Sequence, residues 1–190
     1  MQTLFGLLTQ ITPVPIRLRE YLETYLKRLE VRKKTILLKP GQTAKNIYFI
    51  EKGLVRGFHY EKGKERTSWI MKENDFILSV ESFFLREPSE DVIEIMEDTI
   101  LYSLTYEQLE NAYVVSPGFN EHSRIILQKY YPLSEKRHKM RSKHARDRFK
   151  YLMHHHADLV GRVSDKILAS YLGISVSAFA IEKKNFARGK

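Results

Sequence analysis

The feature that most constrains the fold of this chain is a series of short β-rich runs between residues 35 and 105. The runs lie at Thr35–Leu38, Ile47–Glu51, Leu54–Tyr60, Thr67–Met71, Val92–Met96 and Ile100–Thr105. Turn-forming residues separate several of them, at Lys39-Pro40-Gly41, Lys52-Gly53 and Glu61-Lys62-Gly63-Lys64. Short strands at this close spacing are typical of an antiparallel sandwich or barrel, so we expect one in the middle of the chain.

Helical patterns flank the β-rich region. Residues 16–29 predict a helix, because leucine and tyrosine side chains recur there at spacings of three and four. A second helix is predicted at Glu107–Tyr113, and Pro117-Gly118 ends that segment. A long helical stretch then begins at Phe119, and we expect Pro132 to kink it or end it.

The segment Val163–Lys184 predicts two helices joined by a sharp turn. Ser164 is a good N-cap, and apolar residues follow it at helical spacing. Gly173 then ends the first helix, because glycine tolerates the positive φ of such a turn, and Phe179 is the expected buried anchor of the second helix. The pattern is typical of a helix-turn-helix. An ordinary helical hairpin would have the same pattern, so this segment alone leaves both interpretations open.

The positive charge of the chain is confined to its C-terminal third. Residues 1–118 carry 16 lysines and arginines against 17 acidic residues, a net charge of −1. Residues 119–190 carry 16 against 6, a net charge of +10, and together the two parts give the formal charge of +9. Because this charge coincides with the helix-turn-helix candidate, it favours nucleic acid as a partner over a merely solvated basic helix.

Several chemistries are excluded or disfavoured. The chain has no cysteine, which excludes disulfides, thiolate zinc sites and cysteine nucleophiles. A metal-dependent barrel enzyme needs two or three histidines inside the barrel, and residues 30–105 contain only His59. We interpret Glu94 and Glu97 as part of a solvated face, and the histidines at 154–156 as a solvated helix end. We therefore predict neither an enzyme nor a metal site.

The sequence also bears on localisation. No apolar run approaches the ~20 residues that span a bilayer. The N-terminal stretch MQTLFGLLTQITPVP lacks a basic leader and a small-residue cleavage site. We expect a soluble, cytoplasmic protein with no membrane partner.

A series of short motifs, in its order, resembles the barrel of the cyclic nucleotide-binding domain of Crp/Fnr-type regulators. The motifs are Pro40-Gly41, Tyr48-Phe49-Ile50, Lys52-Gly53, Asn74-Asp75-Phe76, Ser82-Phe83, Pro88-Ser89, Ile93-Glu94 and Glu97-Asp98-Thr99. The resemblance extends through the connecting helix to the terminal helix-turn-helix, and so covers nearly the whole chain.

This resemblance implies an α+β protein in three parts. Residues 1–118 would form an antiparallel double-stranded β-helix (jelly-roll) sensor domain, residues 119–142 a connecting and dimerisation helix, and residues 143–190 a small all-α DNA-binding head. The implied partners are double-stranded DNA, a second copy of the chain and RNA polymerase.

The sequence departs from the cyclic-AMP-binding members of that family. Where they have a Gly-Glu pair this chain has Leu78-Ser79, and Pro88-Ser89-Glu90 stands near the position of their phosphate-binding arginine. A buried phosphate needs a cation or several donors, and the neighbourhood here is acidic. We expect that cyclic AMP is not the ligand. The pocket is predicted either to bind an unidentified small-molecule effector or to be empty, and its expected residues are Ser79, Ser82, Phe83 and Ser89.

A second departure lies in the head. The residues expected to contact DNA are Arg162, Lys166, Ser175, Ser177, Lys183, Lys184 and Arg188. In the Crp/Fnr pattern a Ser-Arg-Ile-like run follows the buried anchor of the second helix, whereas Ala180-Ile181-Glu182 follows Phe179 here. Phosphate contacts are thus well supplied and base-reading side chains are not, which predicts low or shape-based specificity.

Two functions of different classes fit these observations. The first is a homodimeric transcription regulator of Crp/Fnr type. The second is a ligand-binding or protein-interaction module with a degenerate helix-turn-helix that does not bind DNA. Binding to DNA with a steep salt dependence distinguishes them.

Overall fold

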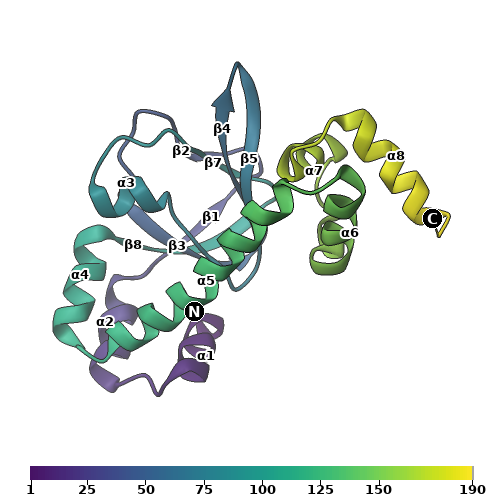
Figure 1. Ribbon diagram of the computed structural model, residues 1–190. Coiled ribbons are helices and arrows are strands. Elements are labelled where there is room, and N and C mark those ends of the chain that lie inside the picture. Colours follow the sequence, from purple (N-terminus) through teal and green to yellow (C-terminus); the bar gives the residue numbers. More distant parts are fainter. Residues whose placement is uncertain (190) are drawn as a thin grey trace. The chain divides into compact units, whose positions relative to one another are not determined.

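Two four-stranded sheets form the centre of the fold in a computed structural model that describes residues 1–189 (Figure 1). The strand order is β1-β8-β3-β6 in one sheet and β2-β7-β4-β5 in the other. The strands are β1 (Lys27–Val31), β2 (Ile36–Leu38), β3 (Asn46–Lys52), β4 (Val55–Glu61), β5 (Lys64–Met71), β6 (Phe76–Ile77), β7 (Val92–Ile95) and β8 (Thr99–Thr105). The pairs β1–β8, β8–β3, β3–β6, β2–β7 and β7–β4 are all antiparallel, which confirms the predicted jelly-roll class.

The chain divides into two compact units. The first, the barrel unit, consists of residues 1–59 and 69–128. The second, the head unit, consists of residues 60–68, at the turn between β4 and β5, together with the chain from residue 129 onward.

The barrel unit is held together by apolar side chains from both sheets. Phe49, Ile50 and Leu101 from one sheet and Ile93 and Ile95 from the other are almost completely buried in one cluster. Burying a side chain of this size contributes about 1.5–3 kcal/mol, so this cluster is the main stabilising feature of the barrel.

The turn at Lys52-Gly53, which the sequence predicted, requires a glycine at position 53. Its φ is +115°, a value that side chains with a Cβ rarely adopt, and an added Cβ would lie 2.8 Å from the Thr99 Cα atom. The turn between β3 and β4 therefore passes directly against the start of β8.

The first predicted helix is shorter than the sequence suggested. Helix α2 spans Ile16–Tyr25, and Lys27–Val31 forms strand β1 instead of continuing the helix. Leu29 pairs with Leu101 in the neighbouring strand, so the backbone groups of this segment bond to the sheet. The prediction of a helix up to Leu29 was wrong, because pairing across 70 residues of sequence outweighed a local helical spacing.

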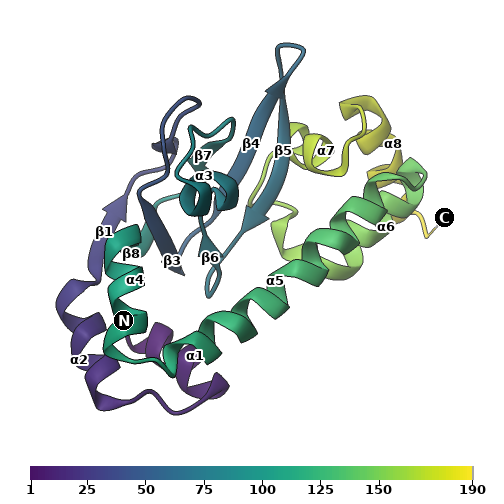
Figure 2. The same ribbon diagram turned by 60° about the vertical axis from the view of Figure 1, so that its left-hand side comes forward.

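Other helices cover the barrel unit. They are α1 (Gln2–Ile11), α3 (Val80–Leu85) and α4 (Tyr106–Val115), of which only α4 was predicted. Helix α4 begins with a capping box, in which Thr105 and Gln108 satisfy each other's backbone N–H groups. Helices α2 and α4 lie side by side (Figures 1 and 2), and the Tyr21 hydroxyl donates to the Gln108 carbonyl at 2.9 Å.

Helix α5 spans Phe119–Arg141 and continues from the barrel unit into the head unit. Pro132 lies inside this helix and does not end it, contrary to one of the two outcomes expected from the sequence. A proline removes a single hydrogen bond of the helix, and the remaining bonds maintain it on both sides.

The head unit contains three α-helices that pack on one another: α6 (Ala145–His155), α7 (Asp165–Leu172) and α8 (Val176–Ala187). Gly173 joins α7 to α8 in the left-handed conformation, with φ at 68° and ψ at 33°. Phe179 is fully buried, and its ring centroid lies 5.2 Å from that of Phe149 on α6. Helix, glycine turn and helix thus form as predicted.

Within the described residues, 1–189, no helix combines the length and the apolar character that crossing a membrane requires.

Candidate nucleic-acid interface

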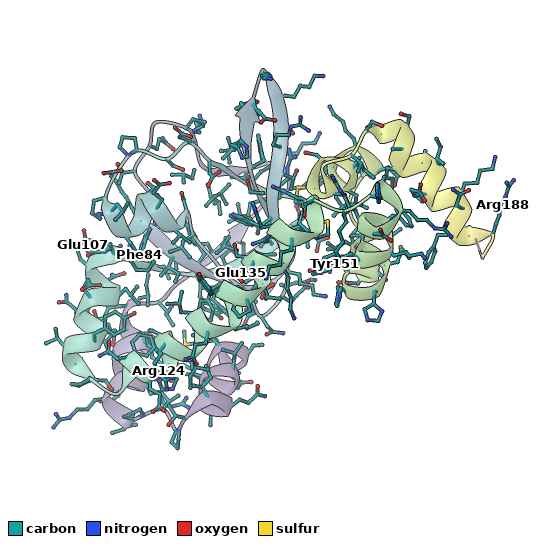
Figure 3. All side chains as sticks on the ribbon, viewed as in Figure 1. Phe84, Glu107, Arg124, Glu135, Tyr151 and Arg188 are labelled. Atoms are coloured by element: carbon teal, nitrogen blue, oxygen red, sulfur yellow. The ribbon has the colours of Figure 1, made fainter. Side chains whose placement is uncertain are left out.

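The second helix of the helix-turn-helix presents one free face to solvent. Because Phe179 points into the head, the residues rotated away from it lie on the opposite side of α8. The exposed residues of that side are Ser177, Ala180, Ile181, Lys184 and Arg188. Arg188 lies at the C-terminal end of the helix (Figure 3). An exposed helix of this kind has the form of an element that enters a DNA major groove.

The start of α8 is held by Ser175, one of the residues predicted to contact DNA. Its hydroxyl accepts a hydrogen bond from the Ala178 backbone N–H at 3.1 Å and lies 3.0 Å from the Ser177 hydroxyl. Ser175 therefore serves first as the N-cap of the helix. The remaining N–H groups of the first turn point out of the helix end, where a phosphate oxygen would be stabilised.

The predicted cations differ in their surroundings. Lys166, Lys184 and Arg188 are exposed, whereas Arg162 is half-buried. The Lys183 amine binds both carboxylate oxygens of Asp165 at 2.9 and 3.0 Å and so links α8 to the start of α7. Because this pair is about half exposed, it contributes at most ~1 kcal/mol to stability. Lys183 thus has a structural partner besides any phosphate.

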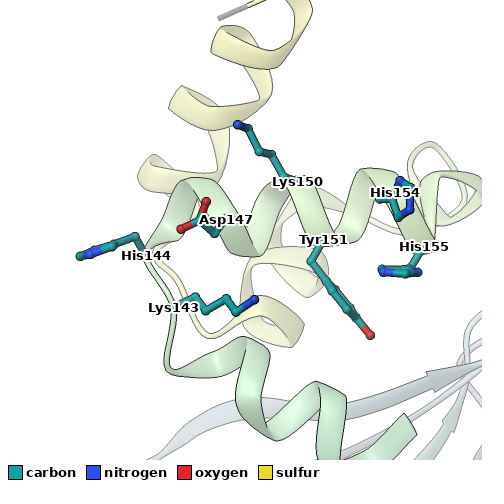
Figure 4. A pocket seen from close by; sticks show the side chains of 7 residues that line it. All are labelled: Lys143, His144, Asp147, Lys150, Tyr151, His154 and His155. Atoms are coloured by element: carbon teal, nitrogen blue, oxygen red, sulfur yellow. The ribbon is translucent and has the colours of Figure 1, made fainter.

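A second basic surface, at residues outside the predicted DNA contacts, lies on α6. A shallow pocket of about 560 Å³ is lined by Lys143, His144, Asp147, Lys150, Tyr151, His154 and His155 (Figure 4). The basic run Glu135–Lys150 was the signal in the sequence that could have indicated it. In the described part of the chain, no group of three or more histidine, cysteine or acidic side chains is arranged to hold a metal ion.

Three hydrogen bonds join residues 60–68 to the helices of the head unit. The Thr67 backbone N–H donates to the Ser170 hydroxyl oxygen at 2.9 Å, and that hydroxyl donates to the Glu65 carbonyl at 3.0 Å. One Arg141 nitrogen donates to the Thr67 carbonyl and also lies 3.4 Å from the Tyr171 carbonyl. Burial lowers the pKa of Arg141 from its ordinary value, and the nearby Arg137 acts in the same direction. No sequence pattern indicated these contacts.

The turn at Gly173 is closed by another arginine. The Arg148 Nη1 atom donates to the Leu172 carbonyl at 3.0 Å and to the Gly173 carbonyl at 2.9 Å. Those carbonyls belong to the free C-terminal end of α7, where a positive charge is favourable. Arg148 therefore holds the turn, whereas its neighbours Arg146 and Lys150 are exposed to solvent.

The four residues predicted to form an effector pocket lie together in the barrel unit, and all are buried. Their hydroxyl groups bond to one another and to the backbone. The Ser79 and Ser89 oxygens lie 3.0 Å apart, and Ser82 accepts from the Ala44 backbone N–H at 2.8 Å while donating to the Glu87 carbonyl. Phe83 is fully buried in the main core. In this structure these side chains secure the α3 segment, and binding of an effector by them stays a prediction.

Arg86, the cation nearest to that segment, is also engaged by the protein. Its Nη1 atom donates to the Ala44 carbonyl at 2.9 Å and to the Phe83 carbonyl at 3.2 Å, and its guanidinium lies 4.6 Å from the centre of the Tyr106 ring. Burial raises the pKa of the nearby Asp91 carboxyl from its ordinary value, and Glu81 and Glu90 raise it further against an opposing effect of His59.

The barrel unit also has a pocket away from the four predicted effector residues. A pocket of about 470 Å³ is lined by residues of β2, β3 and β7 and the loop between β2 and β3, among them Leu38, Gln42, Tyr48 and Ile93. None of the four predicted residues lines it.

Glu94 is not part of a solvated face, because it forms an ion pair with the buried Arg56. That interpretation of Glu94 was wrong, since the register of β4 and β7 sets the two residues opposite each other.

Comparisons with known proteins agree with this architecture. Residues 28–114 match the cyclic nucleotide-binding domain family. No curated protein sequence matches the chain.

Three solved structures illustrate the likeness of fold. CLP of Xanthomonas campestris, described as a c-di-GMP responsive global regulator, is 20% identical with a TM-score of 0.72, covering 90% of this chain and 92% of its own. FixK2 of Bradyrhizobium japonicum is 15% identical with a TM-score of 0.73, covering 86% and 85%. A putative Crp/Fnr-family transcriptional regulator of Eubacterium rectale is 15% identical with a TM-score of 0.72, covering 93% and 85%. The chain therefore carries a cyclic nucleotide-binding domain at residues 28–114 within the fold of the Crp/Fnr family of transcription regulators.

Proposed function

We propose that this protein is a transcription regulator whose head unit binds double-stranded DNA. The observation that carries the proposal is the exposed face of α8, with Lys184 and Arg188 on it, in the C-terminal part of the chain, where residues 119–190 carry a net charge of +10. Helix α8 would enter the major groove, and α7 would lie across the backbone. The exposed cations would neutralise phosphates on either side of the groove.

The basic pocket on α6 supports the same proposal. Lys143 and Lys150 are exposed beside three histidines, with Asp147 as the one carboxylate of the lining. A side-chain set of this kind attracts phosphate and offers no bidentate fork for a base edge. We assign it to contacts with the DNA backbone.

Pairing of two chains through α5 completes the proposal. Leu127 and Tyr131 lie one turn apart on this helix, and 64% and 66% of their surfaces are exposed. Large apolar side chains in such a row are typical of a helix that packs against a second copy of itself. A two-fold dimer would present two α8 helices to two half-sites, as a palindromic operator requires. RNA polymerase remains a predicted partner of such a regulator.

The barrel unit would respond to an effector other than cyclic AMP. The polar groups of Ser82 and Arg86 are bonded to the protein, and the surrounding carboxylates oppose a buried phosphate. CLP is described as responsive to c-di-GMP, so the fold accommodates regulation by ligands other than cyclic AMP. Calorimetry with cyclic AMP tests this part, and we expect no heat of binding.

The experiment that tests DNA binding is a fluorescence-anisotropy titration of a genomic DNA fragment at two or more salt concentrations. We expect the logarithm of the association constant to fall linearly with the logarithm of the salt concentration, by about 0.9 for each phosphate neutralised. Replacing Lys184 and Arg188 by glutamine should reduce that slope by about 2. The matched control replaces Lys33 and Lys34, two exposed lysines of the barrel unit, and should leave the slope unchanged.

The competing function is a protein-interaction module with a degenerate helix-turn-helix. It predicts no binding to DNA at low salt and no difference between the two double variants. Either result would contradict the proposal.

A further inference from the structure

We propose that α8 recognises thymine methyl groups in the major groove through the apolar side chains of Ala180 and Ile181. This inference rests on the proposed function, and it names the sequence feature that the head would read. The target would be a site with thymines at the base pairs that face the middle of α8.

The geometry of α8 sets Ile181 near the centre of its free face and Ala180 at the flank of that face. Each residue of an α-helix is rotated by about 100° from the one before. With Phe179 fully buried, Ile181 lies on the opposite side, one turn after Ser177, while Ala180 lies one turn before Lys184. Ile181 exposes 58% of its surface, although an isoleucine is more often found inside a protein.

The part of this face that precedes Lys184 lacks the long polar side chains that read bases by hydrogen bonding. Ala180 and Ile181 have no side-chain donor or acceptor, and Val176, which is 50% exposed near the helix start, has none either. The Ser177 hydroxyl lies 3.0 Å from the N-cap hydroxyl of Ser175. Among the groups on the major-groove edges of the four bases, the thymine 5-methyl is the one that an apolar side chain can recognise.

The charges around the apolar pair favour DNA over a protein as the occupant. Lys184 and Arg188 follow on the same face, and Lys166 is exposed on α7. The acidic side chains closest in sequence are turned away or compensated: Glu182 is half-buried, and Asp165 binds Lys183. An apolar centre followed by cations on one face is complementary to a duplex, in which methyl groups lie on the groove floor and phosphates form its walls.

The test uses the full-length protein and a duplex selected by it from a random pool. Each thymine of that duplex is then replaced in turn by deoxyuridine, which removes the 5-methyl group and leaves every hydrogen-bonding group in place. At the thymines read by α8 we expect the dissociation constant to rise about fourfold, the factor that corresponds to one buried methyl group. The converse comparison replaces cytosine by 5-methylcytosine at other positions of the site, which adds a 5-methyl group.

Variants connect this effect to the named residues. Ile181→Ala should remove the difference between thymine and deoxyuridine at one or two positions and leave the salt dependence unchanged. The matched control is Ile16→Ala, because Ile16 on α2 is similarly exposed, at 65% against 58% for Ile181, and lies in the barrel unit. Thermal unfolding of both variants checks that the fold is intact.

The outcomes separate this inference from the proposed function. Equal affinity for thymine and deoxyuridine duplexes, with a steep salt dependence retained, overturns methyl recognition and leaves DNA binding in place. Absence of any DNA binding overturns both. A loss of self-association in Ile181→Ala, measured by sedimentation without any change in thymine discrimination, identifies the face as a protein contact and also overturns the inference.

Discussion

The Ser170 hydroxyl oxygen accepts the backbone N–H of Thr67 at 2.9 Å, although the two residues are 103 positions apart in the sequence. The same hydroxyl donates to the Glu65 carbonyl at 3.0 Å. A serine of the helix-turn-helix therefore satisfies the edge of strand β5 as a neighbouring strand would. The end of the β4–β5 hairpin is part of the head unit for this reason.

This contact predicts that Ser170→Ala loosens the hairpin end. The Thr67 N–H loses its partner, and an unsatisfied buried group of this kind costs about 1–3 kcal/mol. We expect the Thr67 amide to exchange with solvent at least ~10-fold faster, as measured by hydrogen exchange. Ser142→Ala is the control, because the Ser142 hydroxyl donates to the Lys139 carbonyl three residues earlier in the sequence, a contact local to the end of α5. Unchanged protection of Thr67 would contradict the prediction.

Gly173→Ala should destabilise the head unit by about 1–2 kcal/mol. The cause is the left-handed backbone at Gly173, which is unfavourable for a residue with a Cβ, and the new methyl group would also lie 3.2 Å from Arg148 Nη1. The midpoint of urea unfolding, followed by circular dichroism, measures the change. Gly6→Ala should have the opposite sign, a gain of about 0.5–1 kcal/mol, because Gly6 lies inside α1 with open space around it. Equal effects of the two substitutions would rule out the conformational explanation.

The buried carboxyl of Asp91 should make the free energy of unfolding depend on pH. Burial raises the pKa of this carboxyl in the folded protein above its value in the unfolded chain. Between those two values the folded state holds more protons, so the stability contributed by Asp91 falls as the pH rises through them and stays low at neutral pH. Asp91→Asn should therefore raise the free energy of unfolding at pH 7, and the gain should disappear toward pH 3. The free energy of unfolding of both proteins, measured by urea unfolding at pH 7 and at pH 3, checks this, and an equal effect of Asp91→Asn at the two pH values would contradict it.

In the proposed dimer, two copies of the chain meet at Leu127 and Tyr131. Replacing both by lysine places two like charges in the proposed dimer contact, and we expect the dissociation constant of the dimer to rise at least ~10-fold. Sedimentation equilibrium measures it. Val114→Lys is the control, since Val114 is 79% exposed on α4, outside the proposed contact. If the double variant dimerised as tightly as the unaltered chain, α5 would not be the interface.

The sequence by itself determined the features that depend on local chemistry. The turn at Gly173, the anchor Phe179 and most of the strands could be predicted, because glycine conformation, helical spacing and alternation of apolar residues act within a few positions. The division of charge between the two parts of the chain could also be read directly, since it depends on composition alone.

Only the tertiary structure decided the features that depend on distant partners. Leu29 became part of a strand because Leu101 pairs with it, and Glu94 became one half of a buried ion pair because β7 lies beside β4. The roles of Ser170, Arg148 and Ser82 follow from backbone groups that lie 24 to 105 positions away in the sequence. Hydrogen bonds and ion pairs of this kind form only where the fold brings their atoms within about 3 Å, and no local pattern encodes that proximity.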